Sequence, residues 1–371
     1  MIYDVGIVGA GILGLAHAWH AARAGKRVIV FERGPRAQGA SVRNFGMLWP
    51  IGQPPGEPHE TALRSRELWQ DALTEAGIWH TPCGSLHLAY ATDELAVFNE
   101  LSDSGLYATK ILTPAQVTNQ AQGIRAQGLK GALWSESEIC VDPREAVAKL
   151  ASYLESRYGV VFRFNTAVLG FKAPLVATSG ELESVDRLIV CAGDDIQSLY
   201  PTALAHEAVV RCKLQMMRTE PQPNNWRIGP MLAAGLTLTH YKAFEICPSL
   251  PALRERLERE YPKYKHYGIH VLVSQTGAGE LTLGDSHEYG AAIEPFDKRS
   301  IDDLVLKYLE SFLEAPSLNI ASRWHGTYLK HREKPWVIAQ PESGVWFVTG
   351  VGGAGMTLSF GLAEKVIKNV F

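Results

Sequence analysis

The residues best suited to chemistry near the N-terminus lie in one short segment, GASVRNFGMLWP, residues 39–50. It carries Ser41, Arg43 and Asn44 and then Gly46-Met47, and it follows neither a helical nor a strand period. Hydroxyl, guanidinium and amide groups suit phosphate oxygens or polar ring edges, and a glycine lets the backbone come close to a ligand. The residues alone leave the role of the segment open, and a solvated surface loop is one interpretation.

The elements before this loop have the pattern of a dinucleotide-binding module. Residues 4–8 form an apolar run typical of a buried strand, and Gly9, Gly11 and Gly14 complete G-x-G-x-x-G at the turn into a helix that stops at Gly25. Gly9 permits the tight turn, Gly11 lets backbone approach a pyrophosphate, and Gly14 lets helix and strand pack closely. An ordinary glycine-rich turn in an α/β core is the alternative.

A second predicted strand, residues 27–31, ends at an acid. Glu32 lies where a carboxylate accepts hydrogen bonds from a ribose hydroxyl, and its charge disfavours the 2′-phosphate of NADP. The module by itself does not separate NAD from FAD. The predicted contacts in this part of the chain are Gly9, Gly11, Ile12, Leu13, Gly14, Glu32 and Arg33.

Three later segments add to this module. A buried strand at 188–191 leads into Ala192-Gly193, and residues 163–170 alternate like a strand that places Val168 against an adenine. Near the C-terminus, residues 345–348 predict a strand, a turn contains four glycines, and 356–370 predict an amphipathic helix. Such a turn directs backbone N–H groups and a helix N-terminus at an electron-rich ligand.

Composition limits the class of protein. A chain of 371 residues that is 46% hydrophobic suits two domains, and 36 basic against 39 acidic residues leave no basic surface for nucleic acid. Five scattered cysteines without a CxxC pair predict neither a disulfide framework nor a metal site, and favour the cytoplasm. The apolar run 5–16 follows an acid and is shorter than the roughly 20 residues of a membrane span, so we expect no signal peptide or transmembrane helix.

The chain resembles the D-amino-acid-oxidase superfamily, in its glycine and sarcosine oxidase branch, over nearly its full length. The resemblance is carried by GAGILG, FERG, SVRNFGM, VCAG, WHGTYLKHREKPWVI and TGVGGAGMTLS. It implies an α/β fold with a Rossmann-like, parallel-sheet FAD-binding domain and an inserted, mostly antiparallel substrate-binding sheet. The implied boundaries are 1–84, 141–213 and 321–371 for the FAD domain, and 85–140 and 214–320 for the substrate domain.

The resemblance also implies FAD as cofactor and assigns its contacts. No cysteine lies between Arg323 and Trp336, where sarcosine oxidase relatives attach flavin, so we expect noncovalent FAD. Beyond the first module, the implied contacts are Ser41, Arg43, Asn44, Phe45, Gly46, Met47, Val168, Ala192, Gly193, Gly326, Gly352, Gly353, Gly355, Met356 and Thr357.

The implied reaction is oxidation of a small amine: hydride passes from the carbon next to nitrogen to flavin, the imine hydrolyses, and oxygen or another acceptor takes the electrons. The flavin is the reactive group, so we assign no catalytic residue. In amino-acid oxidases of this family an arginine after a W-x-G stretch binds the substrate carboxylate, and Tyr328 stands at that place here.

Candidate substrate contacts lie on both sides of that tyrosine in sequence. A cationic cluster follows it, Lys330, His331, Arg332 and Lys334, which is either a solvated loop or a binding site for a dianionic group. Any single one of the twelve histidines, His270 and His287 included, is more often structural or at the surface than functional. The predicted substrate contacts are Met47, His240, Tyr241, Tyr328 and Lys330.

The sequence RNFGM followed by Pro50-Ile51-Gly52-Gln53 resembles a subgroup associated with phosphonate catabolism. The resemblance implies 2-aminoethylphosphonate or its N-methyl derivative as substrate and phosphonoacetaldehyde as product. A glycine, sarcosine or D-amino-acid oxidase is the first alternative. A non-catalytic dinucleotide-binding protein is the alternative of another class.

Overall fold

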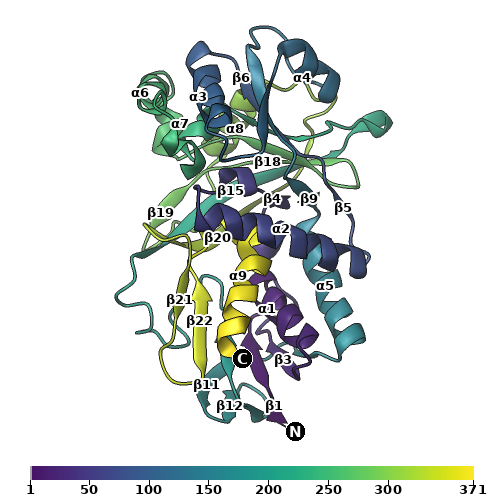
Figure 1. The fold of residues 1–371 in the computed structure, drawn as a ribbon, viewed down its shortest axis with the longest axis vertical. Helices are drawn as coiled ribbons and strands as arrows, with labels where there is room; N and C mark the ends of the chain where they lie inside the picture. The colour runs from purple at the N-terminus through teal and green to yellow at the C-terminus, as the bar shows by residue number, and fades with distance from the viewer. Residues whose placement is uncertain (1) are drawn as a thin grey trace.

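The computed structural model describes residues 2–371 and contains two large sheets, one above the other along the long axis of the molecule (Figure 1). The lower sheet is a parallel sheet with one antiparallel edge strand. Its strands are almost continuously apolar, as expected where both faces of a sheet are covered. In order across the sheet, they are β10 (Val161–Arg163), β3 (Val28–Phe31), β2 (Val5–Val8), β14 (Leu188–Val190), β22 (Val345–Thr349) and β21 (Val337–Ala339).

Four helices pack beside this sheet: α1 (Ile12–Arg23), α2 (Glu57–Glu75), α5 (Pro143–Tyr158) and α9 (Gly355–Val370). The apolar side of α9 lies against α1 and α2, with Phe360 contacting Trp19 and Trp69 at ring-centroid distances of 5.3 and 4.7 Å. Helix α1 can lie close to the end of β2 because Gly14 has no side chain. A Cβ there would lie 1.9 Å from the carbonyl oxygen of Gly9. The predicted strand–turn–helix–strand module is therefore present.

The upper sheet is mostly antiparallel. Only β16 and β6 pair in parallel within it. Its path is β19 (Glu288–Gly290), β15 (Val209–Pro221), β18 (Glu280–Gly284), β17 (Leu272–Gln275), β16 (Met231–Ala234), β6 (Ser85–Ala89), β8 (Gly131–Ser135) and β7 (Thr109–Leu112), with β20 (Ile320–His331) paired to β15.

Five helices belong to the upper half (Figure 1): α3 (Thr92–Asp103), α4 (Pro114–Gln120), α6 (Leu250–Glu260), α7 (Pro262–His266) and α8 (Arg299–Leu309). Strands β15 and β20 pair along nearly their whole length. The domain boundary expected at 213/214 falls inside β15, and the one expected at 320/321 falls at the start of β20. These two strands therefore belong to the upper sheet on both sides of the expected boundaries.

Two small sheets complete the fold. One contains β4 (Met47–Leu48), β9 (Ile139–Val141) and β5 (His80–Thr81), and the other contains β1 (Ile2–Tyr3), β13 (Glu183–Val185), β12 (Leu175–Thr178) and β11 (Val168–Lys172). The single strand expected over 163–170 is wrong. The chain leaves β10 at Arg163, turns at Asn165 with a φ of 53°, and starts β11 in another sheet.

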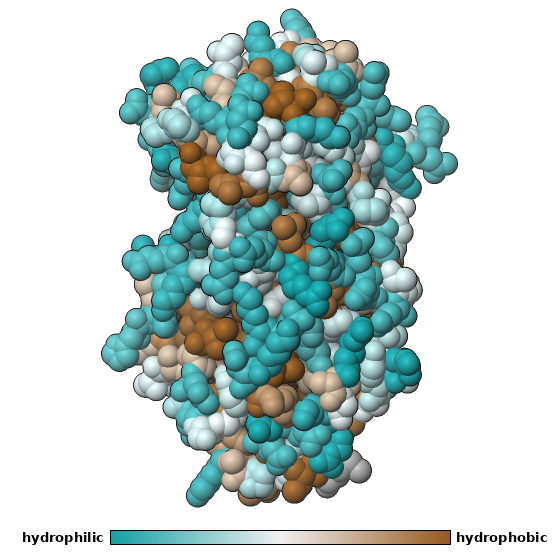
Figure 2. All heavy atoms as spheres, viewed as in Figure 1, coloured by the Kyte–Doolittle hydropathy of each residue, from teal (hydrophilic) through white to brown (hydrophobic). Residues whose placement is uncertain are grey.

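The expected fold class, a parallel dinucleotide-binding sheet with a mostly antiparallel second sheet, is confirmed. Within residues 2–371, no helix has the length and apolar character needed to cross a membrane. The face seen in Figure 2 is largely hydrophilic, with hydrophobic residues gathered in several separate patches.

Candidate active site

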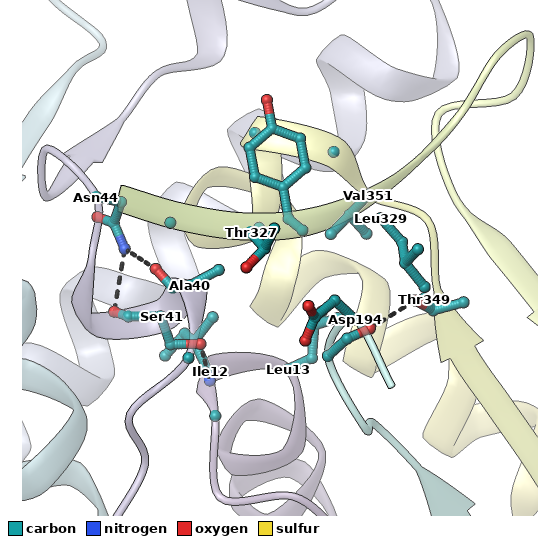
Figure 3. Close-up of a pocket in the computed structure, with 18 of the residues that line it drawn as sticks. Ile12, Leu13, Ala40, Ser41, Asn44, Asp194, Thr327, Leu329, Thr349 and Val351 are labelled. Carbon is teal, nitrogen blue, oxygen red and sulfur yellow. Dashed lines mark hydrogen bonds between the residues drawn. The ribbon is translucent and has the colours of Figure 1, made fainter. Parts of the chain in front are cut away.

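One large cavity, about 840 Å³ in volume, collects the ends of segments from both sheets. The first glycine turn, the loop at 39–50, the turn after β14, strand β20 and the glycine turn before α9 all line it. Figure 3 shows several of these segments around a common space, with Ile12, Ser41 and Asn44 from the N-terminal part and Thr349 and Val351 from the C-terminal part. The two ends of the chain therefore meet at one site.

The first glycine turn is shaped by close backbone contacts. Gly9 has a φ of 101°, and a Cβ there would lie 2.4 Å from the carbonyl oxygen of Cys191. A Cβ on Gly11 would lie 3.0 Å from Oγ of Ser41. That hydroxyl oxygen accepts a hydrogen bond of 2.9 Å from the N–H of Ile12, the first residue of α1 (Figure 3). The loop at 39–50 thus supplies a hydrogen-bond acceptor to the start of the helix.

Glu32 holds the adjacent backbone. One carboxylate oxygen accepts from the N–H of Ala10 at 3.0 Å and the other accepts from the N–H of Gly34 at 2.9 Å. Each oxygen keeps a further lone pair, and the residue lines the cavity where a ribose hydroxyl is expected. Arg33 also lines the cavity and forms an ion pair of 2.8 Å with Asp195.

The loop at 39–50 is fixed by its own side chains. The Asn44 amide donates to the carbonyl oxygens of Ala40 and Ser41 at 2.9 and 3.0 Å (Figure 3), and its oxygen accepts from the N–H of Gly46 at 2.7 Å. Arg43 donates to the carbonyl oxygen of His325 at 3.2 Å. The absence of a period in this loop therefore reflects local hydrogen bonding as well as its place on the cavity.

Gly46, which was predicted from the sequence to contact the cofactor, does not line the cavity. A Cβ there would lie 1.9 Å from the carbonyl oxygen of Val141, and its φ is 72°. The glycine is required by packing against β9, and Gly46 is not among the residues that line the cavity. Gly14 is also outside the cavity, where it brings α1 close to β2.

The C-terminal glycine turn makes room for strand β20. A Cβ on Gly352 would lie 3.3 Å from Cγ of Lys330, and one on Gly353 would lie 3.4 Å from the Tyr328 hydroxyl. The turn is joined to the rest of the site through Thr357, whose Oγ1 accepts a hydrogen bond of 2.9 Å from the N–H of Trp49.

The remaining residues predicted to contact the cofactor all line the same cavity. Space left by glycines, a helix N-terminus and a carboxylate at the end of β3 fit a flavin dinucleotide in this cavity. The predicted cofactor residues that line it are Gly9, Gly11, Ile12, Leu13, Glu32, Arg33, Ser41, Arg43, Asn44, Phe45, Met47, Val168, Ala192, Gly193, Gly326, Gly352, Gly353, Gly355, Met356 and Thr357.

The predicted substrate contacts Met47, His240, Tyr241, Tyr328 and Lys330 also line the cavity. Lys330 is half-buried and, among the described residues, has no carboxylate within ion-pair distance. Burial lowers the pKa of its amine. Its neighbours in the cationic cluster behave differently, since His331 and Lys334 both contact the carboxylate of Glu207, at 3.1 and 2.8 Å.

Three residues that were not predicted as contacts from the sequence also line the cavity: His270, Asp285 and His287. All three are buried, and all line the cavity. His270 precedes β17 and Asp285 follows β18, and the two residues exchange backbone hydrogen bonds across this hairpin. The hairpin of β17 and β18 could have indicated this pairing, because residues equally far from a hairpin turn face each other.

Comparison with known proteins agrees with this geometry. A family model described as FAD dependent oxidoreductase matches residues 4–368. The gamma-glutamylputrescine oxidoreductase of Escherichia coli (strain K12) is 22% identical over 99% of this chain and 83% of its own length.

Solved structures share the fold. Glycine oxidase from Geobacillus kaustophilus has a TM-score of 0.77 at 18% identity, covering 99% of this chain and 94% of that one. An L-alpha-glycerophosphate oxidase from Mycoplasma pneumoniae, solved with FAD bound, has a TM-score of 0.77 at 19% identity, covering 100% and 95%. With its cavity at the meeting point of two glycine turns, the chain belongs to the FAD-dependent oxidoreductase family and is an enzyme that uses FAD.

Proposed function

We propose that the enzyme oxidises a small amine that bears a phosphonate, 2-aminoethylphosphonate or its N-methyl derivative, to phosphonoacetaldehyde. FAD, held by the cofactor-lining residues given above, would supply the hydride acceptor for the carbon next to the amine, and water would complete the conversion of the oxidised amine to the aldehyde. Amine oxidation as the general reaction is supported by the family and by relatives named for glycine and gamma-glutamylputrescine. We further propose noncovalent FAD, the two-domain division given above, and a cytoplasmic location.

The observation that carries the substrate proposal is Lys330. It is a half-buried lysine on the cavity, without a carboxylate partner among residues 2–371. A cation taken partly out of water is stabilised by an anion, so this position favours a substrate with a negatively charged group. The ammonium is a point charge, which does not require the planar geometry of a carboxylate.

Tyr328 supports the same conclusion. It stands where family members with amino-acid substrates have an arginine, and burial raises the pKa of its phenol, so it stays a neutral hydrogen-bond donor. The guanidinium of Arg43 is engaged by the carbonyl oxygen of His325. Because Tyr328 occupies the arginine position on β20, we expect no arginine there to bind the carboxylate of a simple α-amino acid through two hydrogen bonds.

The rest of the substrate end is apolar. Met47, Trp49, Leu214, Met216 and Leu272 line the cavity beside the polar groups. Exclusion of water by these side chains lowers the pKa of a substrate amine and favours its neutral form. The neutral amine is the form that can lose hydride, so these residues prepare the substrate without a dedicated base.

Turnover of a panel of amines tests the proposal. 2-Aminoethylphosphonate, its N-methyl derivative, glycine, sarcosine and D-alanine are compared, with hydrogen peroxide measured in air and flavin bleaching measured without oxygen. We expect the highest kcat/KM on a phosphonate. Flavin bleaching by glycine or sarcosine with none by either phosphonate would instead establish the first alternative, an amino-acid oxidase.

A further inference from the structure

Three histidines from separate segments meet at the inner end of the cavity. His240 follows the 3₁₀ turn 235–239, His270 precedes β17, and His287 follows β18. Their ring centroids are 3.8 Å (240–270), 4.4 Å (240–287) and 5.0 Å (270–287) apart. We call them the histidine cluster. His270 and His287 are buried, whereas His240 is partly open to the cavity.

Asp285 lies beside two members of the cluster. Its carboxyl oxygens lie 3.3 Å from Nε2 of His270 and 3.8 Å from Nε2 of His287. Nδ1 of His287 is 3.1 Å from the carbonyl oxygen of Gly268, and since a carbonyl only accepts, this nitrogen carries the hydrogen. The ring of His287 is therefore held through Nδ1, and its Nε2 is left for a ligand.

Part of this polar cluster lacks a partner. Nδ1 of His270 and Oδ1 of Asp285 are buried and have no hydrogen bond to any of residues 2–371. Buried polar atoms in proteins are nearly always paired, and leaving one unpaired is costly. Because both residues line the cavity, unpaired atoms here point to a ligand that supplies hydrogen bonds.

The charges around the cluster favour an anion. The groups around it are the amine of Lys330, the phenols of Tyr241 and Tyr328, and the carboxyl of Asp285, with the exposed Lys242 and Glu245 near Lys330. Burial raises the pKa of the Asp285 carboxyl well above its usual value, which favours its neutral form over a carboxylate that would repel an anion. The same burial lowers the pKa of His287 to about 4, so its ring is neutral at pH 7. Its one N–H is already donated to the Gly268 carbonyl, so His287 donates to an anion only when Nε2 takes up a proton as the anion binds.

The three rings are close enough for their nitrogens to share one ligand. The planes of His240 and His270 are inclined by 32°, and those of His270 and His287 by 19°. The planes of His240 and His287 are inclined by 44°, and one nitrogen of each ring lies within 4.8 Å of the others. Nitrogens this close can hold either a metal ion or the oxygens of one tetrahedral group, and the amine of Lys330 beside them favours the anion.

We propose that His240, His270 and His287, with Lys330, form an oxyanion subsite that binds the phosphonate of the substrate. The proposal rests on the proposed function for the identity of the substrate. It assigns the two ends of the substrate to different places: the tetrahedral group lies at the histidine cluster, and the amine lies toward Met47 and the loop at 39–50.

Binding of an inert ligand tests the subsite without turnover. Ethylphosphonate has no amine to oxidise, and its binding to the holoenzyme can be followed by the change in flavin absorbance. We expect His270→Gln and His287→Gln each to weaken binding by about ten-fold or more, since hydrogen bonds to charged groups are lost. His266→Gln, an exposed histidine on α7, is the matched control and should leave the affinity unchanged.

A second measurement needs no variant. The wild-type protein should bind ethylphosphonate more tightly than propionate, and dialysis against a chelator should not change the affinity. Equal affinity in wild type and both histidine variants would overturn the subsite. So would a stoichiometric metal ion whose removal abolishes binding, since the cluster would then be a metal centre.

The outcomes separate the two proposals. If ethylphosphonate binds through the histidines but 2-aminoethylphosphonate is not oxidised, the subsite stands and the proposed substrate fails. If 2-aminoethylphosphonate is oxidised with an unchanged KM in the histidine variants, the proposed function stands and the subsite fails.

Discussion

Ser41 connects the loop at 39–50 to the first turn of α1. Its hydroxyl accepts from the N–H of Ile12, while Gly11 leaves space beside it. A helix with glycine at its N-cap has no capping side chain of its own, and Ser41 supplies that function from another segment. The loop is thereby held at the place where the cofactor phosphates are expected.

Replacing Ser41 with alanine should weaken FAD retention. Loss of a capping hydroxyl costs about 1 kcal/mol, which corresponds to roughly five-fold weaker binding. The measurement is FAD dissociation on dilution, followed by flavin fluorescence. Ser156→Ala on the exposed face of α5 is the control. Equal retention in both variants would mean that the hydroxyl does not support the cofactor site.

Lys330 is the residue whose charge should matter most for substrate. Lys330→Met is expected to raise the KM for 2-aminoethylphosphonate by about ten-fold or more while FAD stays bound. Lys330→Arg should recover part of the affinity because it keeps the charge. Lys307→Met, on the exposed side of α8, controls for the loss of one positive charge. A KM that is the same in Lys330→Met and wild type would place the anion elsewhere.

At the scale of elements, the contact between α1 and β2 depends on Gly14. A Cβ there would lie 1.9 Å from the carbonyl oxygen of Gly9, so Gly14→Ala must push helix and strand apart. We expect loss of bound FAD and a lower Tm, measured by flavin absorbance and thermal unfolding. Gly170→Ala in β11, where no atom lies within 4 Å, is the control. A Gly14→Ala protein with full FAD content would contradict close packing at this point.

Helices α2 and α9 are linked by a surface ion pair that depends on pH. Arg64 donates to Glu364, and this contact lowers the pKa of the carboxyl to about 2. A lowered carboxyl pKa means that the pair stabilises the fold above the unfolded pKa, near 4.5, and that this contribution is lost as pH falls toward 2.

Glu364→Gln should therefore lower the free energy of unfolding by about 0.5–1 kcal/mol at pH 7, a modest value because Arg64 is half-exposed. The difference from wild type should shrink below pH 4. Urea unfolding at several pH values measures this, with Glu67→Gln, whose carboxylate also contacts Arg64 but is more exposed, for comparison. A difference that does not depend on pH would point to packing as its cause.

At the scale of the whole molecule, the cavity draws residues from both sheets and both ends of the chain. A ligand bound there contacts segments that are far apart in sequence, so it should stabilise the entire fold. FAD at about 100 times its Kd adds about 2.7 kcal/mol to the free energy of unfolding. We expect the Tm to rise as FAD is added to protein stripped of flavin. An unchanged Tm with bound FAD would mean that the segments are held in place without it.

The helices, strands and turns around the cavity could be predicted from the sequence. Contacts between segments far apart in the chain could not. The turn at Gly9–Gly14, the strand ending at Glu32 and the closing helix α9 are each encoded within a short window. The histidine cluster depends on the pairing of β17 with β18 and on the turn at 235–239, which no local period reports. The strand expected over 163–170 failed because alternation continued across the turn at Asn165.

The meeting of the two glycine turns also sets an order of events during synthesis. The first turn, α1 and the loop at 39–50 leave the ribosome early, but the cavity they line is closed by residues 349–357, which are made after both large sheets. A nascent chain that ends before this turn has the other lining segments but lacks the one that closes the cavity. Capture of the flavin is therefore a late step, and shorter translation products should emerge colourless.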